Sequence, residues 1–114
     1  MCAIMGFTKK SRTKEEIAPY FDRTLSRGPD QSKIVETPSG WLCFHRLAIM
    51  GLDESGMQPF SLEGDMVVCN GELYGWRKLK AELEGRGYTF QSGSDCELLL
   101  PLYREYGLDM FSML

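Results

Sequence analysis

Two segments with helical spacing alternate with short apolar runs, and this alternation limits the possible folds more than any other feature. From Ile17 to Leu25 apolar side chains recur every three or four residues, until the string 27–30 (Arg-Gly-Pro-Asp) ends the predicted helix. Residues 72–83 repeat the pattern before Gly85 and Gly87. Because neither helices nor strands dominate, and no repeat is present, we predict an α+β fold.

The candidate strands are short and are bounded by turn-forming residues. They cover residues 2–7, 33–37, 41–49 and 66–69. The string 38–40 (Pro-Ser-Gly) predicts a hairpin between the second and the third. We expect these strands to form one sheet, with residues 89–91 as a further short strand. Residues 51–64 are predicted to be a loop, long enough to have a functional role.

A final helix is predicted after Ser94 or Asp95, either of which can cap it. Pro101 lies inside this segment and is expected to kink the helix or to shift its start. The predicted apolar face consists of Leu98, Leu99, Leu102, Tyr103 and Tyr106.

Composition excludes several classes of protein. With 114 residues, 43% of them hydrophobic, the chain is long enough for one small domain, predicted over residues 1–114. A net charge of -3 gives no general attraction to phosphate backbones, so no nucleic-acid partner is expected. No apolar run is long enough to cross a membrane and no export signal opens the chain, so we expect a cytoplasmic protein with no membrane partner.

The four cysteines are far apart in the sequence, and His45 is the sole histidine. This spacing does not match a zinc site, so no metal site is predicted. The cysteines are expected to be reduced, with Cys43, Cys69 and Cys96 as packing residues. Cys2 is chemically distinct, because only the initiator methionine precedes it.

Six short strings occur in the order and approximate spacing of one protein family. The chain resembles the glutaminase domain of class II glutamine amidotransferases, which are amino-terminal nucleophile hydrolases. The Arg-Gly-Pro-Asp string favours the asparagine synthetase branch of that family. The strings are residues 1–7 (Met-Cys-Ala-Ile-Met-Gly-Phe), 27–30 (Arg-Gly-Pro-Asp), 45–47 (His-Arg-Leu), 58–59 (Gln-Pro), 70–74 (Asn-Gly-Glu-Leu-Tyr) and 92–95 (Ser-Gly-Ser-Asp).

The resemblance implies an αββα sandwich, of which this chain would be the amino-terminal portion. It makes residues 1–114 a truncated type-2 glutamine amidotransferase domain that lacks a synthetase domain. The implied partners are glutamine and, in an intact relative, the synthetase domain. Unpaired sheet edges also favour a homodimer. No cofactor is expected in this chain, because ATP and Mg²⁺ would serve only the absent synthetase domain.

The implied reaction is the hydrolysis of glutamine to glutamate and ammonia through a thioester on Cys2. Once Met1 is removed, Cys2 carries both a thiol and a free α-amino group. An ordinary α-amino pKa of about 7.7–8.0 leaves part of this group unprotonated at neutral pH, so it can act as the base. Nucleophile and base then belong to one residue, and no histidine is needed.

The resemblance also assigns the groups around the nucleophile. Asn70 and Gly71 match the oxyanion-hole pair, which donates hydrogen bonds to the charge that develops on the amide oxygen. Arg46 would bind the α-carboxylate of glutamine. Asp95 would accept from the α-amino group, assisted by Glu72.

Each assignment has a structural alternative. Cys2 could be a buried thiol, Asn70 and Gly71 an ordinary hairpin turn, and Arg46 with His45 a surface pair on a strand. Asp95 and Ser94 also fit a plain helix cap, in addition to any ligand role. Two functional alternatives also remain: a non-catalytic fragment or regulatory piece, for example with Met1 retained, and a glutamine-binding or assembly module completed by another chain.

Overall fold

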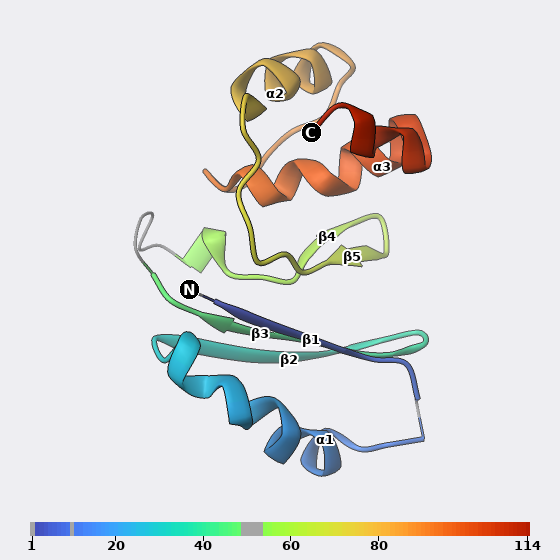
Figure 1. Ribbon diagram of the computed structural model, residues 1–114. Helices are drawn as coiled ribbons and strands as arrows, with labels where there is room; N and C mark the ends of the chain where they lie inside the picture. Colours follow the sequence, from blue (N-terminus) through green and yellow to red (C-terminus); the bar gives the residue numbers. More distant parts are fainter. Residues whose placement is uncertain (1, 10, 49–53) are drawn as a thin grey trace.

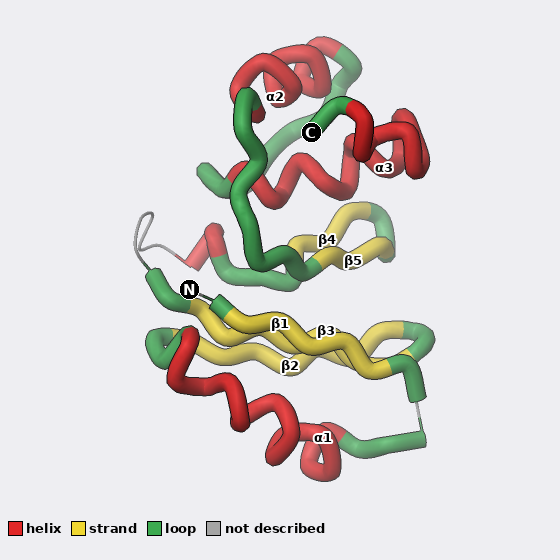
Figure 2. Tube along the Cα trace, viewed as in Figure 1, coloured by secondary structure: helices red, strands yellow, loops and turns green. Residues whose placement is uncertain are grey.

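The computed structural model describes residues 2–9, 11–48 and 54–114, and its elements are arranged in four layers (Figure 1). Helices form the two outer layers and strands the two inner ones (Figure 2). The layers stack along the longest dimension of the molecule, whose extents are 43 × 31 × 23 Å. The elements are β1 (Ala3–Phe7), α1 (Lys14–Phe21), β2 (Gln31–Thr37), β3 (Gly40–Arg46), β4 (Phe60–Leu62), β5 (Asp65–Val67), α2 (Trp76–Gly85) and α3 (Leu99–Tyr106).

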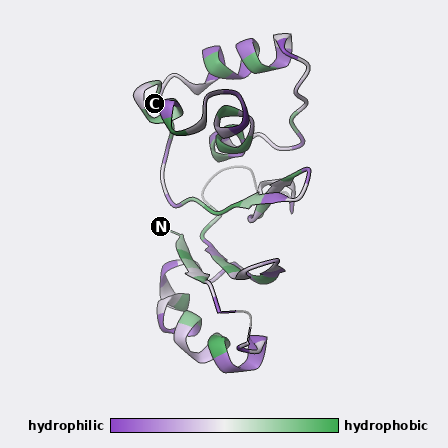
Figure 3. Cartoon of the chain, turned by 90° about the vertical axis from the view of Figure 1, so that its right-hand side faces the viewer, coloured by the Kyte–Doolittle hydropathy of each residue, from purple (hydrophilic) through white to green (hydrophobic). Residues whose placement is uncertain are grey.

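The layer order is α1, then the sheet β1-β3-β2, then the hairpin β4-β5, then α3 with α2. The α+β fold class is therefore confirmed, and the order α, β, β, α is the one that the resemblance implied. A view turned by 90° shows the same stacking (Figure 3).

The first sheet is antiparallel, with β3 in the centre. Its register opposes Met5 and Ile34 to Cys43, so these apolar side chains share one face. On that face they pack with Ile17 and Phe21 of α1, and this small core holds the helix against the sheet. The predicted first helix is confirmed at these two positions, and it continues as a 3₁₀ segment, Asp22–Arg27.

The larger hydrophobic core lies on the opposite side of the molecule, between the β4-β5 hairpin and the two later helices. Phe60 from β4, Leu83 from α2 and Leu102 from α3 are all buried in it. Among the residues that the structure describes, none belongs to both cores. Each half of the molecule is therefore held together by its own apolar contacts.

The expectation of a single sheet is wrong. Residues 66–69 do not join the first sheet, because β5 pairs with β4 in a separate hairpin. Its turn places Glu63 and Gly64 at positive φ, 48° and 90°. The predicted loop 51–64 contains strand β4 and a short 3₁₀ segment, Glu54–Gly56, while residues 49 and 51–53 lie outside the described residues.

The helices of the second half also differ from the prediction. α2 begins at Trp76 rather than at 72. Gly75, directly before it, has a left-handed φ of 68°, which is not a helical conformation, so the helix cannot include residues 72–75. Residues 89–91 form no strand: the N–H of Gln91 donates to the Glu97 carboxylate, 2.9 Å away, instead of pairing with a neighbouring chain.

Pro101 shifts the start of the last α-helix, one of the two predicted effects. It lies in the first turn of α3, where its missing N–H has no helical acceptor to lose. A 3₁₀ segment, Asp95–Leu98, precedes it. The predicted apolar face is correct for Leu98 and Leu102, which are fully buried, and wrong for Tyr103, a residue that is 55% exposed.

Among the described residues, no helix is long and apolar enough to cross a membrane.

Candidate active site

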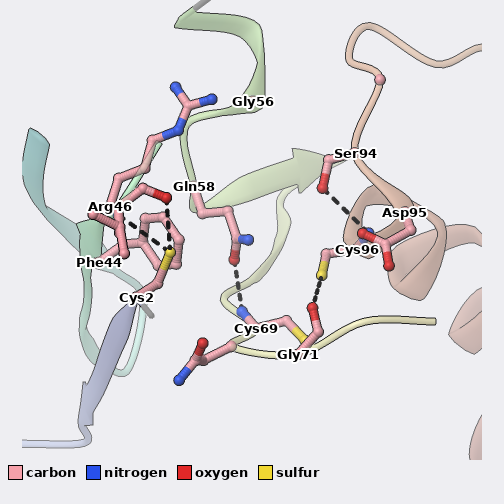
Figure 4. Close-up of a pocket in the computed structure, with 13 residues that line it drawn as sticks. Cys2, Phe44, Arg46, Gly56, Gln58, Cys69, Gly71, Ser94, Asp95 and Cys96 are labelled. Carbon is pink, nitrogen blue, oxygen red and sulfur yellow. Dashed lines mark hydrogen bonds between the residues drawn. The ribbon is translucent and has the colours of Figure 1, made fainter. Parts of the chain in front are cut away.

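A pocket of about 440 Å³ lies between the two halves of the molecule. This volume is within the usual range for a small-molecule site. Figure 4 shows Cys2, Phe44 and Arg46 on one side of the pocket and Cys69, Gly71, Asp95 and Cys96 on the other, with Gln58 between them. Five of the six site residues predicted from the sequence line it: Cys2, Arg46, Asn70, Gly71 and Asp95.

Strand β1 determines the position of Cys2. Cys2 directly precedes the strand, whose first residue, Ala3, pairs with His45 of β3. The Cys2 thiol is half-buried, and its sulfur lies 3.4 Å from the backbone nitrogen of Leu47 and 3.8 Å from its carbonyl oxygen. Cys2 is therefore fixed beside the end of β3 and faces the pocket, which does not fit a thiol that is only a core residue.

The Arg-Gly-Pro-Asp string forms a turn that is bonded to the same end of β3. The Asp30 N–H donates to the Arg46 carbonyl at 3.0 Å, and the Asp30 carboxylate accepts from the Ala48 N–H at 2.8 Å. Gly28 is required here: a Cβ atom would overlap the His45 carbonyl and lie 2.8 Å from the Arg46 nitrogen. The turn therefore sets the backbone on which Arg46 stands.

The side chain of Arg46 is buried at the pocket wall, and one guanidinium nitrogen donates to the Gln31 side-chain oxygen at 3.0 Å. The neighbouring His45 is fully buried on the other face of the strand. There it stacks on Phe21 with ring centroids 3.5 Å apart, and its ring nitrogens contact Ser32 and the Phe21 carbonyl. The alternative of a surface pair is therefore wrong.

Residues 69–71 form the opposite wall. Buried Gln58 accepts a hydrogen bond from the Cys69 N–H at 2.6 Å, which anchors the segment that carries Asn70 and Gly71. The alternative of a hairpin turn at Asn70-Gly71 is wrong, because the next regular element after β5 is α2 and not a paired strand. Asn70 is exposed, so its side-chain amide is accessible to a ligand.

Asp95 connects two segments of the wall. One carboxylate oxygen accepts from the Leu73 N–H at 2.6 Å and the other from its own neighbour, the Cys96 N–H, at 2.9 Å. The predicted cap is confirmed for Ser94, whose hydroxyl also accepts from the Cys96 N–H. Asp95 therefore has a structural role beyond capping, and it lines the pocket.

Glu72 is the one predicted site residue that does not line the pocket. It is exposed, in the irregular stretch that leads to α2. Its assistance to Asp95 in binding an α-amino group stays a prediction.

The thiols of Cys69 and Cys96 shift each other's pKa. Donation from Cys96 to the Cys69 thiolate lowers the pKa of Cys69, while the same interaction and burial raise the pKa of Cys96. Cys43 is buried in the small core, and the loss of solvent raises its pKa to about 11. The expectation of packing cysteines is therefore confirmed for Cys43 and Cys96, whereas Cys69 is only half-buried.

Sequence reasoning missed other lining residues. Gln58 lies in one of the six strings, but its bond to Cys69 joins positions eleven residues apart, and no local pattern indicates that contact. Gly93 and Ser94 are held at the pocket by Glu97, which accepts from the N–H groups of Gln91 and Ser92. Among the described residues, no group of three or more His, Cys, Asp or Glu side chains could hold a metal ion.

Comparison with known proteins gives a consistent result. The family model "Glutamine amidotransferase domain" matches residues 1–114. A probable glutamine-hydrolysing asparagine synthetase of Schizosaccharomyces pombe is 40% identical over 100% of this chain and 21% of its own length. The corresponding Dictyostelium discoideum protein is 36% identical over 100% of this chain and 22% of its own length. Glutamine-hydrolysing asparagine synthetase 1 of Bacillus subtilis is 35% identical over 93% and 18%.

The chain thus spans about a fifth of the length of these relatives. The whole-chain match, the αββα layers and the pocket lined by five motif residues lead to one conclusion. The chain belongs to the glutamine amidotransferase domain family.

Proposed function

We propose that this chain hydrolyses glutamine to glutamate and ammonia, with Cys2 as the nucleophile. The single observation that carries the proposal is the pocket that gathers Cys2, Arg46, Asn70, Gly71 and Asp95 from segments far apart in the sequence. These residues supply a thiol, a cation, an anion and two amide donors around one space. Glutamine requires this combination, since it has a reactive amide at one end and a zwitterion at the other.

In the proposed first step, the α-amino group of Cys2, freed by loss of Met1, takes the thiol proton. The sulfur then attacks the side-chain amide carbon of glutamine, and negative charge develops on the amide oxygen. The Asn70 side-chain amide and the Gly71 N–H donate to that oxygen, and donors of this kind contribute about 10²- to 10³-fold in rate each.

In the second step the carbon–nitrogen bond breaks, and the Cys2 ammonium group returns the proton to the leaving ammonia. A γ-glutamyl thioester remains on the sulfur. Water attacks this thioester, the carbon–sulfur bond breaks, and glutamate leaves with the thiol restored. The chemistry uses no cofactor in this chain.

Recognition of the zwitterionic end is assigned to Arg46 for the α-carboxylate and to Asp95 for the α-amino group, with Glu72 assisting. The guanidinium is buried and already directed by Gln31, which reduces the cost of ordering it on binding. The Asp95 carboxylate is fixed by two backbone N–H groups, so its position does not depend on the ligand.

Where this domain is part of a longer protein like its relatives, we propose that the ammonia passes to a synthetase domain, which would use ATP and Mg²⁺ to make asparagine. The names of the relatives, glutamine-hydrolysing asparagine synthetases, support this larger role. A cytoplasmic location is consistent with four free cysteines.

The test is ammonia and glutamate release from glutamine by the purified chain, after intact mass has established the loss of Met1. We expect steady release by the wild type and release at background level by Cys2→Ala. Hydroxylamine should trap the thioester as γ-glutamyl hydroxamate in the wild type alone. Thermal unfolding of Cys2→Ala checks that the variant is folded.

Equal release by the two proteins would contradict the proposal. If neither releases ammonia although Met1 is absent, calorimetric titration with glutamine separates the two alternatives: binding indicates a glutamine-binding or assembly module, and no binding indicates a non-catalytic fragment.

A homodimer is also proposed. β1 and β2 are the outer strands of the first sheet, and each leaves one row of backbone groups without a strand partner within that sheet. Light scattering after size-exclusion chromatography measures the mass directly, and a mass of 13.0 kDa at all concentrations would contradict it.

A further inference from the structure

Two cysteines other than Cys2 meet at the pocket wall, on both sides of Gly71. Cys69 is half-buried and Cys96 is 3% exposed, and both line the pocket. The Cys96 sulfur lies 3.5 Å from the Gly71 carbonyl oxygen. A dashed line in Figure 4 marks this interaction. A Cβ atom on Gly71 would lie 3.8 Å from the Cys69 sulfur. Both sulfurs therefore lie beside the same glycine, and each thiol shifts the pKa of the other.

We propose that Cys69 and Cys96 are an oxidant-sensitive pair that closes to a disulfide beside Asn70 and Gly71 and thereby switches off the pocket. The formation of the disulfide is independent of the proposed glutamine hydrolysis. Its effect on catalysis rests on that function.

The two thiols differ in a way that suits this chemistry. The hydrogen bond from Cys96 lowers the pKa of Cys69, so Cys69 carries more thiolate at neutral pH, and it is the more exposed of the two. Cys96 is buried and retains its proton, because the bond to Cys69 and the loss of solvent raise its pKa. Cys69 is therefore the attacking thiol, and Cys96 is the resolving thiol.

With hydrogen peroxide as the oxidant, the reaction balances in two steps. The Cys69 thiolate attacks one peroxide oxygen, the O–O bond breaks, and the departing hydroxide takes a proton to become water. The Cys96 sulfur then attacks the sulfenic sulfur of Cys69, the S–O bond breaks, and a second water leaves. The two thiols lose two electrons and two protons in total, and one peroxide becomes two waters.

Formation of the disulfide changes the pocket because it removes the S–H hydrogen of Cys96. While Cys69 keeps its proton, the Cys96 S–H is the donor to the Gly71 carbonyl. A disulfide has no S–H, so Gly71 loses this contact while the chain between Cys69 and Gly71 is drawn toward Cys96. The proposed oxyanion donors are then displaced, and a shift of about 1 Å at such a site can cost about 100-fold in rate. We expect a 10- to 100-fold loss of glutamine hydrolysis.

Peptide mapping tests the disulfide directly. Trypsin separates Cys69, in residues 47–77, from Cys96, in residues 87–104, and leaves Cys43 in residues 34–46. After treatment of the folded chain with limiting peroxide, we expect the peptides 47–77 and 87–104 to be linked, with a loss of 2 Da (two hydrogens), and dithiothreitol to separate them. The variants Cys69→Ser and Cys96→Ser should show no such link, and Cys43 should stay reduced.

The proposal is overturned if Cys69 and Cys96 are oxidised separately, or if Cys69 links to Cys2 instead. In a chain that hydrolyses glutamine, the rate should fall on oxidation and recover with dithiothreitol, and any loss that persists in Cys69→Ser, which lacks the attacking thiol, measures oxidation at Cys2. A linked pair with an unchanged rate would refute the switch. A chain that never hydrolyses glutamine contradicts the proposed function and leaves the peptide result as it stands.

Discussion

At the scale of single residues, the pocket is built from side chains that are held by backbone groups. Asp95, Asp30 and Gln58 each accept from a main-chain N–H in a different segment. Bonds of this kind fix a side chain without the need for a second side chain as its partner. The residues that face the ligand are therefore positioned before it binds, which favours both affinity and rate.

Replacement of Arg46 by lysine is the first prediction at this scale. Lysine keeps the charge but loses the planar pair of donors that fits a carboxylate. A hydrogen bond to a charged group contributes about 1.5–3 kcal/mol, so KM for glutamine should rise about 10- to 100-fold. Steady-state kinetics with glutamine measures the change.

The matched control is the α-amide of glutamine, which lacks the carboxylate. Wild type and Arg46→Lys should use this analogue about equally poorly. If Arg46→Lys weakens both substrates to the same degree, Arg46 does not bind the carboxylate.

The order in which the thiols react is the second prediction. Since its pKa is lowered, Cys69 has more thiolate at neutral pH than Cys43, whose pKa is raised to about 11 by burial. In the folded protein iodoacetamide should therefore modify Cys69 well before Cys43, and raising the pH should accelerate Cys43 far more. Mass spectrometry of tryptic peptides follows both. In denaturing urea the two rates should converge; a difference that persists there would rule out the folded environment as its cause.

At the scale of elements, glycine allows the turn at residues 27–30 to pack against β3. In Gly28→Ala the new methyl group would overlap the His45 carbonyl, so the turn must move. We expect a loss of about 1–3 kcal/mol in the free energy of unfolding, measured by urea denaturation. Glutamine hydrolysis should also be slower, because Arg46 directly follows His45 in the strand. Gly85→Ala is the control, since nothing lies within 4 Å of its added Cβ. An equal loss in both variants would contradict the steric argument.

The same scale shows why the sequence predicted some elements and not others. Ile17 and Phe21 have helical spacing, and both are buried where that spacing predicts. Strand β4 has only three residues, Phe60–Leu62, so no periodic pattern marks it inside an apparent loop. The start of α2 depends on the backbone conformation of Gly75, which apolar spacing does not indicate. The site residues were easier to predict than these elements. Six strings in order predicted a shared site for Cys2 and Asp95, and both residues line one pocket.

At the scale of the whole molecule, two halves with separate cores enclose the pocket. Cys2 and Arg46 belong to the half with α1, whereas Asn70, Gly71 and Asp95 belong to the half with α3. A ligand that contacts both sides adds a connection that neither core provides. Binding should therefore stabilise the molecule beyond either half alone.

Glutamate, the product, provides the test in the variant Cys2→Ala, which does not turn over. At 100 times its Kd a ligand of the native state adds about 2.7 kcal/mol, so the melting temperature should rise by several degrees. Differential scanning calorimetry measures the rise. An equal rise with D-glutamate, whose α-groups are exchanged in space, would show that Arg46 and Asp95 do not read the zwitterion.

The division into two cores has a mechanical consequence. Because the nucleophile and its oxyanion donors lie on different halves, catalysis depends on how rigidly the two halves are held relative to each other, and not only on which side chains are present. A distant substitution that loosens one core would then reduce the rate although every reactive group is still present. The distance between the Cys2 sulfur and the oxyanion donors Asn70 and Gly71 would no longer be fixed.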